Sequence, residues 1–243
     1  MKRRVSVRTL YAYLKGRESI ELLERDILPL KEDEVLVEAT QASICDADLR
    51  AYRGMYMPGD LPSFEYIGHE GGGVVVDVGA KVTRFLVGDR VMAFGPVNTL
   101  SSLFKSAEDF LQPVPDNLTM KQGCLGEPTA VGLFGLFESG AQLGDLVLVA
   151  GLNYQGHIVA QGFKKMSCEV IVVDYSGRHL ELAKQRGADI VVNSHEINSV
   201  AHIRGITNGR GVDVAFHSCG YWNPHAEEYF NLCAELVRDE GIM

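Results

Sequence analysis

Short apolar segments alternate with helix-length segments through the second half of this 243-residue chain. Four segments have the length and composition of buried strands: DLVLVAG (145–151), EVIVVD (169–174), DIVVN (189–193) and VDVAFHS (212–218). Parallel strands need a crossover connection, which is usually a helix, so this alternation indicates a parallel sheet. The second half is therefore predicted to be an α/β domain.

A glycine pattern follows the first of these strands. Gly151 and Gly156 occupy the outer positions of Gly-x-Gly-x-x-Gly, and Asn153 stands at the middle one. In dinucleotide-binding folds the first glycine forms a tight turn, the second lets the backbone approach the pyrophosphate, and the third lets the helix pack on the strand. We expect Asn153 to replace the second glycine because asparagine tolerates a positive φ.

An acidic residue ends the next strand, since Asp174 lies 18 residues after Gly156. A carboxylate at this place holds the ribose hydroxyls of NAD and repels the additional phosphate of NADP. The predicted NAD-binding residues are Gly151, Asn153, Tyr154, Gly156, Asp174 and Arg178. Two alternatives stay open: the glycines can serve only close packing in another α/β protein, and Arg178 can be a solvated helix residue instead of a neighbour of the adenine.

The first half of the chain has a different pattern, with strand-like segments interrupted by glycine. EVLVEATQASI (34–44), GGGVVVDVG (71–79) and VGDRVMAF (87–94) are rich in β-branched residues and bounded by turn residues. This half is predicted to be a small, mostly β barrel. The segment 94–117 carries prolines and polar residues, and we expect it to join the two halves.

Four side chains suitable for a metal accompany this β-rich half: Cys45, His69, Glu70 and Glu127. Thiolate, imidazole and carboxylate together suit Zn²⁺, whose catalytic sites use three protein ligands and keep one position open. Each residue also has a simpler interpretation. Cys45 can be a small buried apolar side chain, Glu127 can favour a helix N-terminus, and Glu70 can belong to a solvated acidic face.

Composition bears on the binding partners of the protein and on its cellular location. The net charge of −9 argues against nucleic-acid binding, because no basic excess displaces counterions from phosphates. No run of about 18 apolar residues occurs, so a membrane span is not expected. Five scattered cysteines without a CxxC pair favour reduced thiols and a cytoplasmic protein. The final segment, LVRDEGIM (236–243), has a helix end and then a strand-like start, so we expect the sequence to be a fragment.

The quoted residues resemble the zinc-dependent medium-chain alcohol dehydrogenase superfamily, most nearly its sorbitol, threonine and glucose dehydrogenase-like branch. The segments that carry the resemblance are ICDADLRAYRG (44–54), GHEGGGVVVDVGAKVTRFLVGDRV (68–91), LGEPTAVGLFGL (125–136) and VIVVDYSGRHLELAKQRGADIVVN (170–193). The resemblance implies a GroES-like β-barrel catalytic domain (1–122) and then a Rossmann doubly wound parallel sheet (123–243), incomplete at its C-terminus.

The resemblance also implies roles for individual residues. Cys45 and His69 match the zinc ligands, and Glu70 and Glu127 match carboxylates that complete or approach the coordination sphere. Asp48 matches an aspartate that accepts the far N–H of the histidine and fixes its ring. The glycines after Glu70 are expected to let the chain turn closely beneath the metal.

Two departures from the family pattern limit what is carried over. Ala47 stands where many members have a hydroxyl that relays the alcohol proton, and Arg50 stands where several have a relay histidine. The proton would then leave through Glu70, Glu127 or bound water. The four-cysteine lobe that holds a structural zinc in many members is absent, so a single catalytic zinc is expected.

The implied function is hydride transfer between a secondary alcohol, polyol or sugar-like, and NAD. A homodimer or homotetramer is expected by resemblance. Two alternatives remain: a non-catalytic or weakly active NAD-binding relative, and a zinc-free reductase that prefers NADP. Asp174 and the set of Cys45, His69 and Glu70 argue against the reductase.

Overall fold

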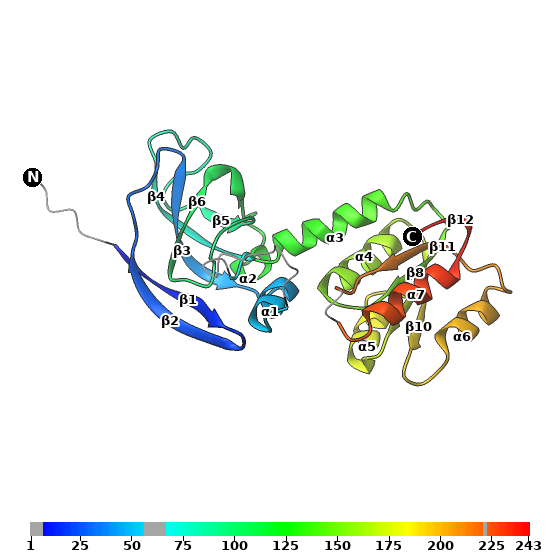
Figure 1. Ribbon diagram of the computed structural model, residues 1–243. Coiled ribbons are helices and arrows are strands. Elements are labelled where there is room, and N and C mark those ends of the chain that lie inside the picture. Colours follow the sequence, from blue (N-terminus) through cyan, green and yellow to red (C-terminus); the bar gives the residue numbers. More distant parts are fainter. Residues whose placement is uncertain (1–6, 56–66, 221–222) are drawn as a thin grey trace, which may run out of the picture. The chain divides into compact units, whose positions relative to one another are not determined.

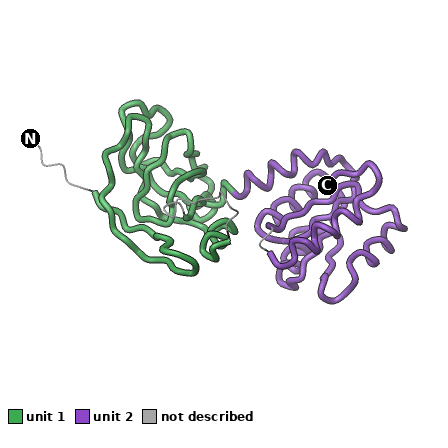
Figure 2. Tube along the Cα trace, viewed as in Figure 1, with its two compact units in different colours: residues 1–127 green, residues 128–243 purple. Residues whose placement is uncertain are grey.

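A computed structural model describes residues 7–55, 67–220 and 223–243 (Figure 1). The chain divides into two compact units, residues 1–127 and 128–243, which are called the N-terminal and C-terminal units below (Figure 2). Among the described residues, no helix is both long enough and apolar enough to cross a membrane.

The N-terminal unit contains an antiparallel five-stranded sheet in the order β6-β3-β4-β5-β7. Its strands are β3 (Glu34–Ala42), β4 (Gly71–Val78), β5 (Arg90–Ala93), β6 (Leu103–Ala107) and β7 (Leu111–Pro113). A separate antiparallel hairpin consists of β1 (Arg8–Gly16) and β2 (Ser19–Asp26). The helices are α1 (Asp46–Tyr52), α2 (Met120–Gly123) and a 3-10 turn (Glu108–Phe110). Valines of neighbouring strands, including Val35, Val37, Val75 and Val91, form the buried core of this sheet.

The glycine run after Glu70 belongs to a strand and is not a turn. Gly71, Gly72 and Gly73 open β4, which pairs with β3. A Cβ atom on Gly73 would lie 1.8 Å from the carbonyl oxygen of Glu38 on β3. The strand predicted over residues 71–79 is therefore present, and its glycines let two strand backbones approach closely and do not form a turn.

The C-terminal unit contains a five-stranded parallel sheet in the order β10-β9-β8-β11-β12. Its strands are β8 (Leu146–Ala150), β9 (Glu169–Asp174), β10 (Ile190–Asn193), β11 (Val212–His217) and β12 (Val237–Ile242). The helices are α4 (Tyr154–Lys165), α5 (Gly177–Gln185), α6 (Ser199–Ile206) and α7 (Ala226–Leu236), and α3 (Gly126–Glu138) spans the boundary between the units. The predicted parallel sheet with crossover helices is confirmed.

Successive strand residues in this sheet face opposite layers. Val147 and Val149 pack in one cluster with α4 and α5, whereas Leu148 and Ala150 pack in a second cluster with α6 and α7. Because strand side chains alternate between faces, a strand that is apolar at every position is buried on both sides. The uninterrupted apolar runs of the sequence therefore specify a sheet with helices on both faces.

The helix end expected within the final segment, residues 236–243, lies at the first residue of that segment. The structure ends α7 at Leu236 and begins β12 at Val237. Arg238 on β12 donates from Nε to Asp213 on β11 at 2.6 Å, and this contact holds the segment as an edge strand. A tertiary contact thus decides the boundary, which local periodicity could not indicate.

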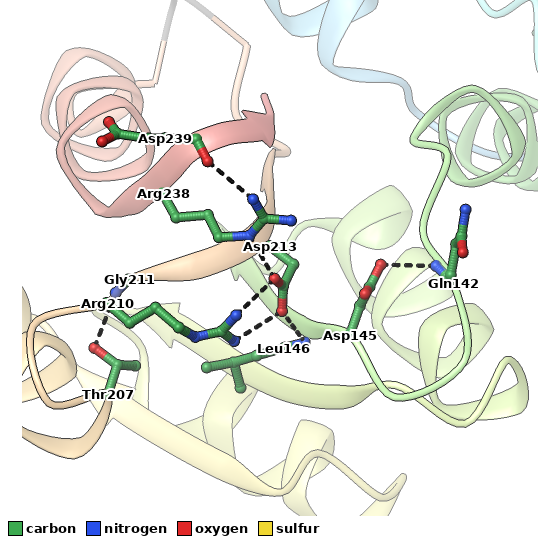
Figure 3. Close-up of polar contacts among 9 residues, drawn as sticks. All are labelled: Gln142, Asp145, Leu146, Thr207, Arg210, Gly211, Asp213, Arg238 and Asp239. Carbon is green, nitrogen blue, oxygen red and sulfur yellow. Dashed lines mark hydrogen bonds and ion pairs between the residues drawn. The ribbon is translucent and has the colours of Figure 1, made fainter.

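Asp213 is the centre of a polar network at the amino ends of β8, β11 and β12 (Figure 3). Its carboxylate accepts two hydrogen bonds from the Arg210 guanidinium, both at 2.9 Å, and a further one from the Leu146 N–H, also at 2.9 Å. Burial alone would raise the pKa of Asp213, but these hydrogen bonds and that from Arg238 outweigh burial and hold the pKa well below its usual value. The network ties three strands together.

Candidate functional site

Three potential metal ligands converge in the N-terminal unit. The Cys45 thiol, the His69 imidazole and the Glu70 carboxylate offer ligand atoms that all lie within 4.8 Å of one another. Cys45 is the N-cap of α1, and His69 and Glu70 immediately precede β4. The structure thus assembles donors that are 24 residues apart in the sequence (69 − 45 = 24).

Asp48 fixes the two chain segments that carry these donors. One carboxylate oxygen accepts the Cys45 N–H at 2.8 Å, and the other accepts the Gly68 N–H at 2.8 Å. The distance from Asp48 Oδ1 to His69 Nδ1 is 3.7 Å, longer than a hydrogen bond. In this structure Asp48 therefore positions the backbone on both sides of the group, whereas the hydrogen bond to the histidine ring expected from the sequence is not formed.

Ser43 also contacts the group, and the sequence did not single it out. Its hydroxyl donates a very short hydrogen bond to Glu70 Oε2, and its backbone N–H donates to the Glu70 carbonyl at 2.9 Å. The signal for this contact is strand register, because Ala42 at the end of β3 lies opposite Gly71 of β4. Strand register depends on pairing between distant segments, so the contact of Ser43 with Glu70 could not be predicted from the sequence around Ser43.

The electrostatics of the group favour a cation. Burial and the nearby Glu70 carboxylate raise the pKa of Cys45 to about 12. Burial and Glu70 also raise the pKa of Glu127, and His69 partly opposes this rise. The Glu70 side chain itself is only 4% exposed. Buried carboxylates are normally paired or bind metals, and a divalent cation here would stabilise both the thiolate and the carboxylates.

The donor set fits zinc. Thiolate, imidazole and carboxylate are the zinc ligands of protein sites, and three protein ligands leave one position for a further group. Glu127 is not a member of the compact group. Among the described residues, Glu70 is thus better placed than Glu127 to be the third ligand. The backbone of Ala47 lowers the pKa of Cys45 and so partly offsets this rise.

The glycine loop of the C-terminal unit shows two close approaches. Gly151 has φ of +86°, and a Cβ there would lie 2.3 Å from the Cys219 sulfur. A Cβ on Gly156 would lie 2.2 Å from the Gly151 carbonyl oxygen. Gly151 therefore provides the tight turn, and Gly156 provides the close packing of α4 on β8.

Asn153 has a different role from the expected one. Its φ is −67°, so it does not adopt the left-handed conformation of a glycine substitute. It is the N-cap of α4: Oδ1 accepts the Gly156 N–H at 2.9 Å and the Ser218 hydroxyl at 2.6 Å. The reason given for asparagine from the sequence is wrong, because the side chain satisfies a helix N-terminus and links it to the chain after β11.

Asp174 is buried at the carboxyl end of β9, only 3% exposed. Its two oxygens accept the Leu152 N–H at 2.7 Å and the Ser176 N–H at 2.8 Å. The ring nitrogen Nδ1 of His179 also lies 3.3 Å from Asp174 Oδ1. The same carboxylate thus connects the glycine loop to the turn after β9.

A cavity of about 620 Å³ lies between the first turn of α4 and the length of α5. Tyr154 and Arg178, both predicted to contact the cofactor, line it together with Asn153, His157 and His179. Three of the predicted nucleotide-binding residues, Asn153, Tyr154 and Arg178, thus line this cavity, whereas Gly151, Gly156 and Asp174 do not.

Two family models match the chain. The alcohol dehydrogenase GroES-like domain matches residues 31–137, and the zinc-binding dehydrogenase domain matches residues 156–243. The chain belongs to the zinc-type medium-chain alcohol dehydrogenase superfamily. The predicted fold class, a GroES-like domain followed by a Rossmann parallel sheet, is confirmed.

Several curated members of the superfamily are similar over most of this chain. An uncharacterized zinc-type alcohol dehydrogenase-like protein of Escherichia coli (strain K12) is 28% identical over 86% of this chain and 70% of its own length. Sorbitol dehydrogenase of Bacillus subtilis (strain 168) is 28% identical over 88% of this chain and 69% of its own length. D-arabitol-phosphate dehydrogenase of Enterococcus avium is 24% identical over 93% of this chain and 71% of its own length. These relatives identify the chain as an oxidoreductase of the superfamily.

Solved structures of the superfamily agree on the fold. An Escherichia coli oxidoreductase/dehydrogenase of unknown specificity has a TM-score of 0.87 and 26% identity, covering 98% of this chain and 76% of that one. A 2R,3R-butanediol dehydrogenase of Bacillus subtilis has a TM-score of 0.81 at 24% identity, covering 97% and 77%, and supports the fold alone.

The N-cap role of Asn153 predicts a modest loss of stability on substitution. Asn153→Ala is expected to lower the free energy of unfolding by about 1 kcal/mol, because the Gly156 N–H loses its acceptor. The matched control is Asn198→Ala, which removes the equivalent cap from Ala201 N–H at the start of α6. Urea unfolding of both variants tests the assignment, and an unchanged midpoint for Asn153→Ala would contradict it.

Proposed function

We propose that this chain is a zinc-dependent oxidoreductase that transfers a hydride between NAD and a secondary alcohol of a polyol or sugar-like substrate. The observation that carries the proposal is the convergence of Cys45, His69 and Glu70 in a superfamily of zinc-type alcohol dehydrogenases. The sorbitol and arabitol-phosphate dehydrogenases among the relatives support the substrate class. One zinc and one NAD would be bound per chain.

The chain's own residues have defined tasks in this proposal. Cys45, His69 and Glu70 hold the metal, and Asp48 and Ser43 keep them in place. Bound zinc would supply Lewis-acid chemistry at the alcohol oxygen, which favours loss of the alcohol proton. Near neutral pH that proton needs an acceptor, and Ala47 offers no hydroxyl to relay it.

Glu127 is our choice for holding this proton. Burial raises the pKa of Glu127, because it disfavours the charged carboxylate and so makes that carboxylate a better proton acceptor than an exposed one. Glu127 also remains outside the compact donor group, which leaves its oxygens available for that purpose.

In this proposal the nucleotide binds at the loop after β8. Gly151 forms the tight turn, Gly156 lets α4 pack on β8, Asp174 accepts the ribose hydroxyls, and Tyr154 and Arg178 line the adjoining cavity. Bound NAD would take the hydride, and the protein's contribution is its orientation. The domain limits 1–122 and 123–243, a cytoplasmic location, and a homodimer or homotetramer stay predictions.

A second candidate is an NAD-binding relative without turnover. Ala47 and Arg50, which replace the usual relay groups, favour it. Oxidation of sorbitol and related polyols by zinc-loaded protein, followed as NADH formation, separates the two. Turnover supports the enzyme, whereas zinc and NADH binding without any turnover supports the relative.

Removing the thiol tests the metal site directly. Purified wild-type protein is expected to contain about one zinc per chain, and Cys45→Ala is expected to contain almost none because a three-ligand site loses its sulfur. Elemental analysis gives the metal content, and NADH fluorescence gives nucleotide binding, which should not change. Cys168→Ala, a buried thiol of the C-terminal unit, is the control and should keep its zinc. Well-folded wild-type protein without zinc would sink the proposal.

Zinc affinity should rise with pH. Because the pKa of Cys45 is raised to about 12 in the metal-free protein, the thiol is protonated at neutral pH and must lose its proton on binding. The apparent affinity is therefore expected to increase about tenfold per pH unit between about pH 7.5 and 9. Competition with a chelator at several pH values measures this slope, and a flat profile would show that the thiolate is not a ligand.

A further inference from the structure

A second cavity, of about 500 Å³, lies in the N-terminal unit beside α1 and the β1–β2 hairpin. Aliphatic side chains, among them Leu14, Ile67 and Leu100, form much of its lining, and Glu18, Asp48 and Tyr52 provide its polar groups. Small-molecule sites in proteins typically have volumes of about 300–1,000 Å³ and mainly apolar walls with a few polar groups. The cavity therefore has the size and chemistry of a ligand site.

The cavity adjoins a small core. The buried cluster at this place consists of Ala12, Leu14, Ala51 and Ile67. Aliphatic side chains at the cavity rim stay accessible: Ile20 is 48% exposed and Ile44 is 56% exposed. An apolar ligand would gain free energy by covering these side chains, because it removes apolar surface from water.

Asp48 decides which head group such a ligand needs. Its oxygens already accept the N–H groups of Cys45 and Gly68, yet a carboxylate can accept further hydrogen bonds. A carboxylate cannot donate a hydrogen bond, so the head group of the ligand must be the donor. The other acid of the cavity, Glu18, is exposed and adds a second negative charge, which favours a cation over a neutral donor.

The geometry points to a binding site for a compact apolar amine in this cavity, with its ammonium group on Asp48 and its hydrocarbon body against the aliphatic lining. The site is outside the candidate metal group but shares Asp48 with its support. Gly68, which precedes His69, also lies against the cavity wall: a Cβ there would be 2.3 Å from Leu100 Cγ. Amine binding and metal binding therefore act on the same carboxylate and loop.

Three matched probes test the head-group requirement on the full chain by isothermal titration calorimetry. They are cyclohexylmethylamine, the neutral cyclohexylmethanol and the anionic cyclohexanecarboxylate. The amine is expected to bind about tenfold more tightly than the alcohol, because a charge-assisted hydrogen bond replaces a neutral one, and the carboxylate is expected not to bind. Absence of amine binding, or equal binding of amine and carboxylate, would overturn the proposal.

Two variants locate the site. Leu49→Phe fills the cavity from α1 and is expected to weaken amine binding at least about tenfold, whereas Leu22→Phe, on the exposed strand β2 and outside the lining, should not. Glu18→Gln is expected to weaken binding of the amine and to leave binding of the alcohol unchanged. The control Glu21→Gln should change the affinity for neither probe. Unchanged amine affinity in both Leu49→Phe and Glu18→Gln would place the ligand elsewhere and refute the site.

Zinc provides the final comparison. The amine is expected to bind about fivefold more weakly to zinc-loaded than to zinc-free protein, because both cations compete for the field of Asp48, and the effect is reciprocal. Equal affinities would refute the sharing of Asp48. Zinc content and NADH binding are measured on the same samples, so a failure of the proposed dehydrogenase function is distinguished from a failure of the amine site.

Discussion

Asp213→Ala is expected to lower the free energy of unfolding of the C-terminal unit by about 3 kcal/mol. Asp213 is 8% exposed and accepts hydrogen bonds from Arg210, Arg238 and the Leu146 N–H (Figure 3). Truncation leaves the Leu146 N–H and two guanidinium groups without their shared acceptor. Both arginines are partly exposed, so water compensates for part of the loss.

Urea unfolding followed by circular dichroism measures this effect. Asp239→Ala is the control, since Asp239 is exposed on the same strand, β12, and its substitution should change stability by less than about 0.5 kcal/mol. A loss for Asp213→Ala no larger than that of Asp239→Ala would mean that the network does not hold the strands together.

The same variant should lose part of the acid sensitivity of the protein. The folded-state pKa of Asp213 is held below its unfolded value, so its contribution is complete above about pH 4 and is lost as pH falls from there toward the folded pKa. The stability difference between wild type and Asp213→Ala should therefore be constant from about pH 7 to 5 and should shrink below about pH 4. A difference that stays constant down to about pH 2 would contradict the assignment.

Phe163→Ala is expected to lower the free energy of unfolding by about 4 kcal/mol, the second large effect on stability. The Phe163 side chain is fully buried on α4 and contacts Phe216 of β11 edge to face, with ring centroids 6.4 Å apart. Its removal leaves a cavity between the helix layer and the sheet, where neighbouring strands cannot move to fill it.

A phenylalanine on another helix of the same unit provides the comparison. Phe134 on α3 is 68% exposed, so Phe134→Ala should change the free energy of unfolding by less than about 1 kcal/mol. Both variants are measured by urea unfolding under identical conditions. Equal losses for the two would mean that Phe163 is not part of the core as described.

The parallel sheet could be predicted because its signal is local. Each strand from β8 to β11 is a short apolar run, and each is followed by a helix whose apolar face is visible in the sequence. Gly151 and Gly156 could also be interpreted correctly, since a tight turn and a close helix approach both demand glycine. These features depend on residues that are near one another in the chain.

The features that could not be predicted depend on contacts between distant segments. Asn153 bonds Ser218, which is 65 residues away, and Asp48 bonds the Gly68 N–H, which is 20 residues away. The strand β12 pairs with β11, and its Arg238 bonds Asp213, which is 25 residues away. The metal group itself was indicated by family resemblance and not by spacing, because Cys45 and His69 are joined only by folding.

The hydrogen bonds of Asp174 have a kinetic consequence. By holding the Leu152 and Ser176 N–H groups, this carboxylate shapes the glycine loop before any nucleotide arrives. A nucleotide that meets a preformed loop does not wait for the chain to order, and little binding free energy is spent on ordering. Nucleotide association should then be a single fast step limited by encounter and orientation, with differences between nucleotides expressed in how quickly each one leaves.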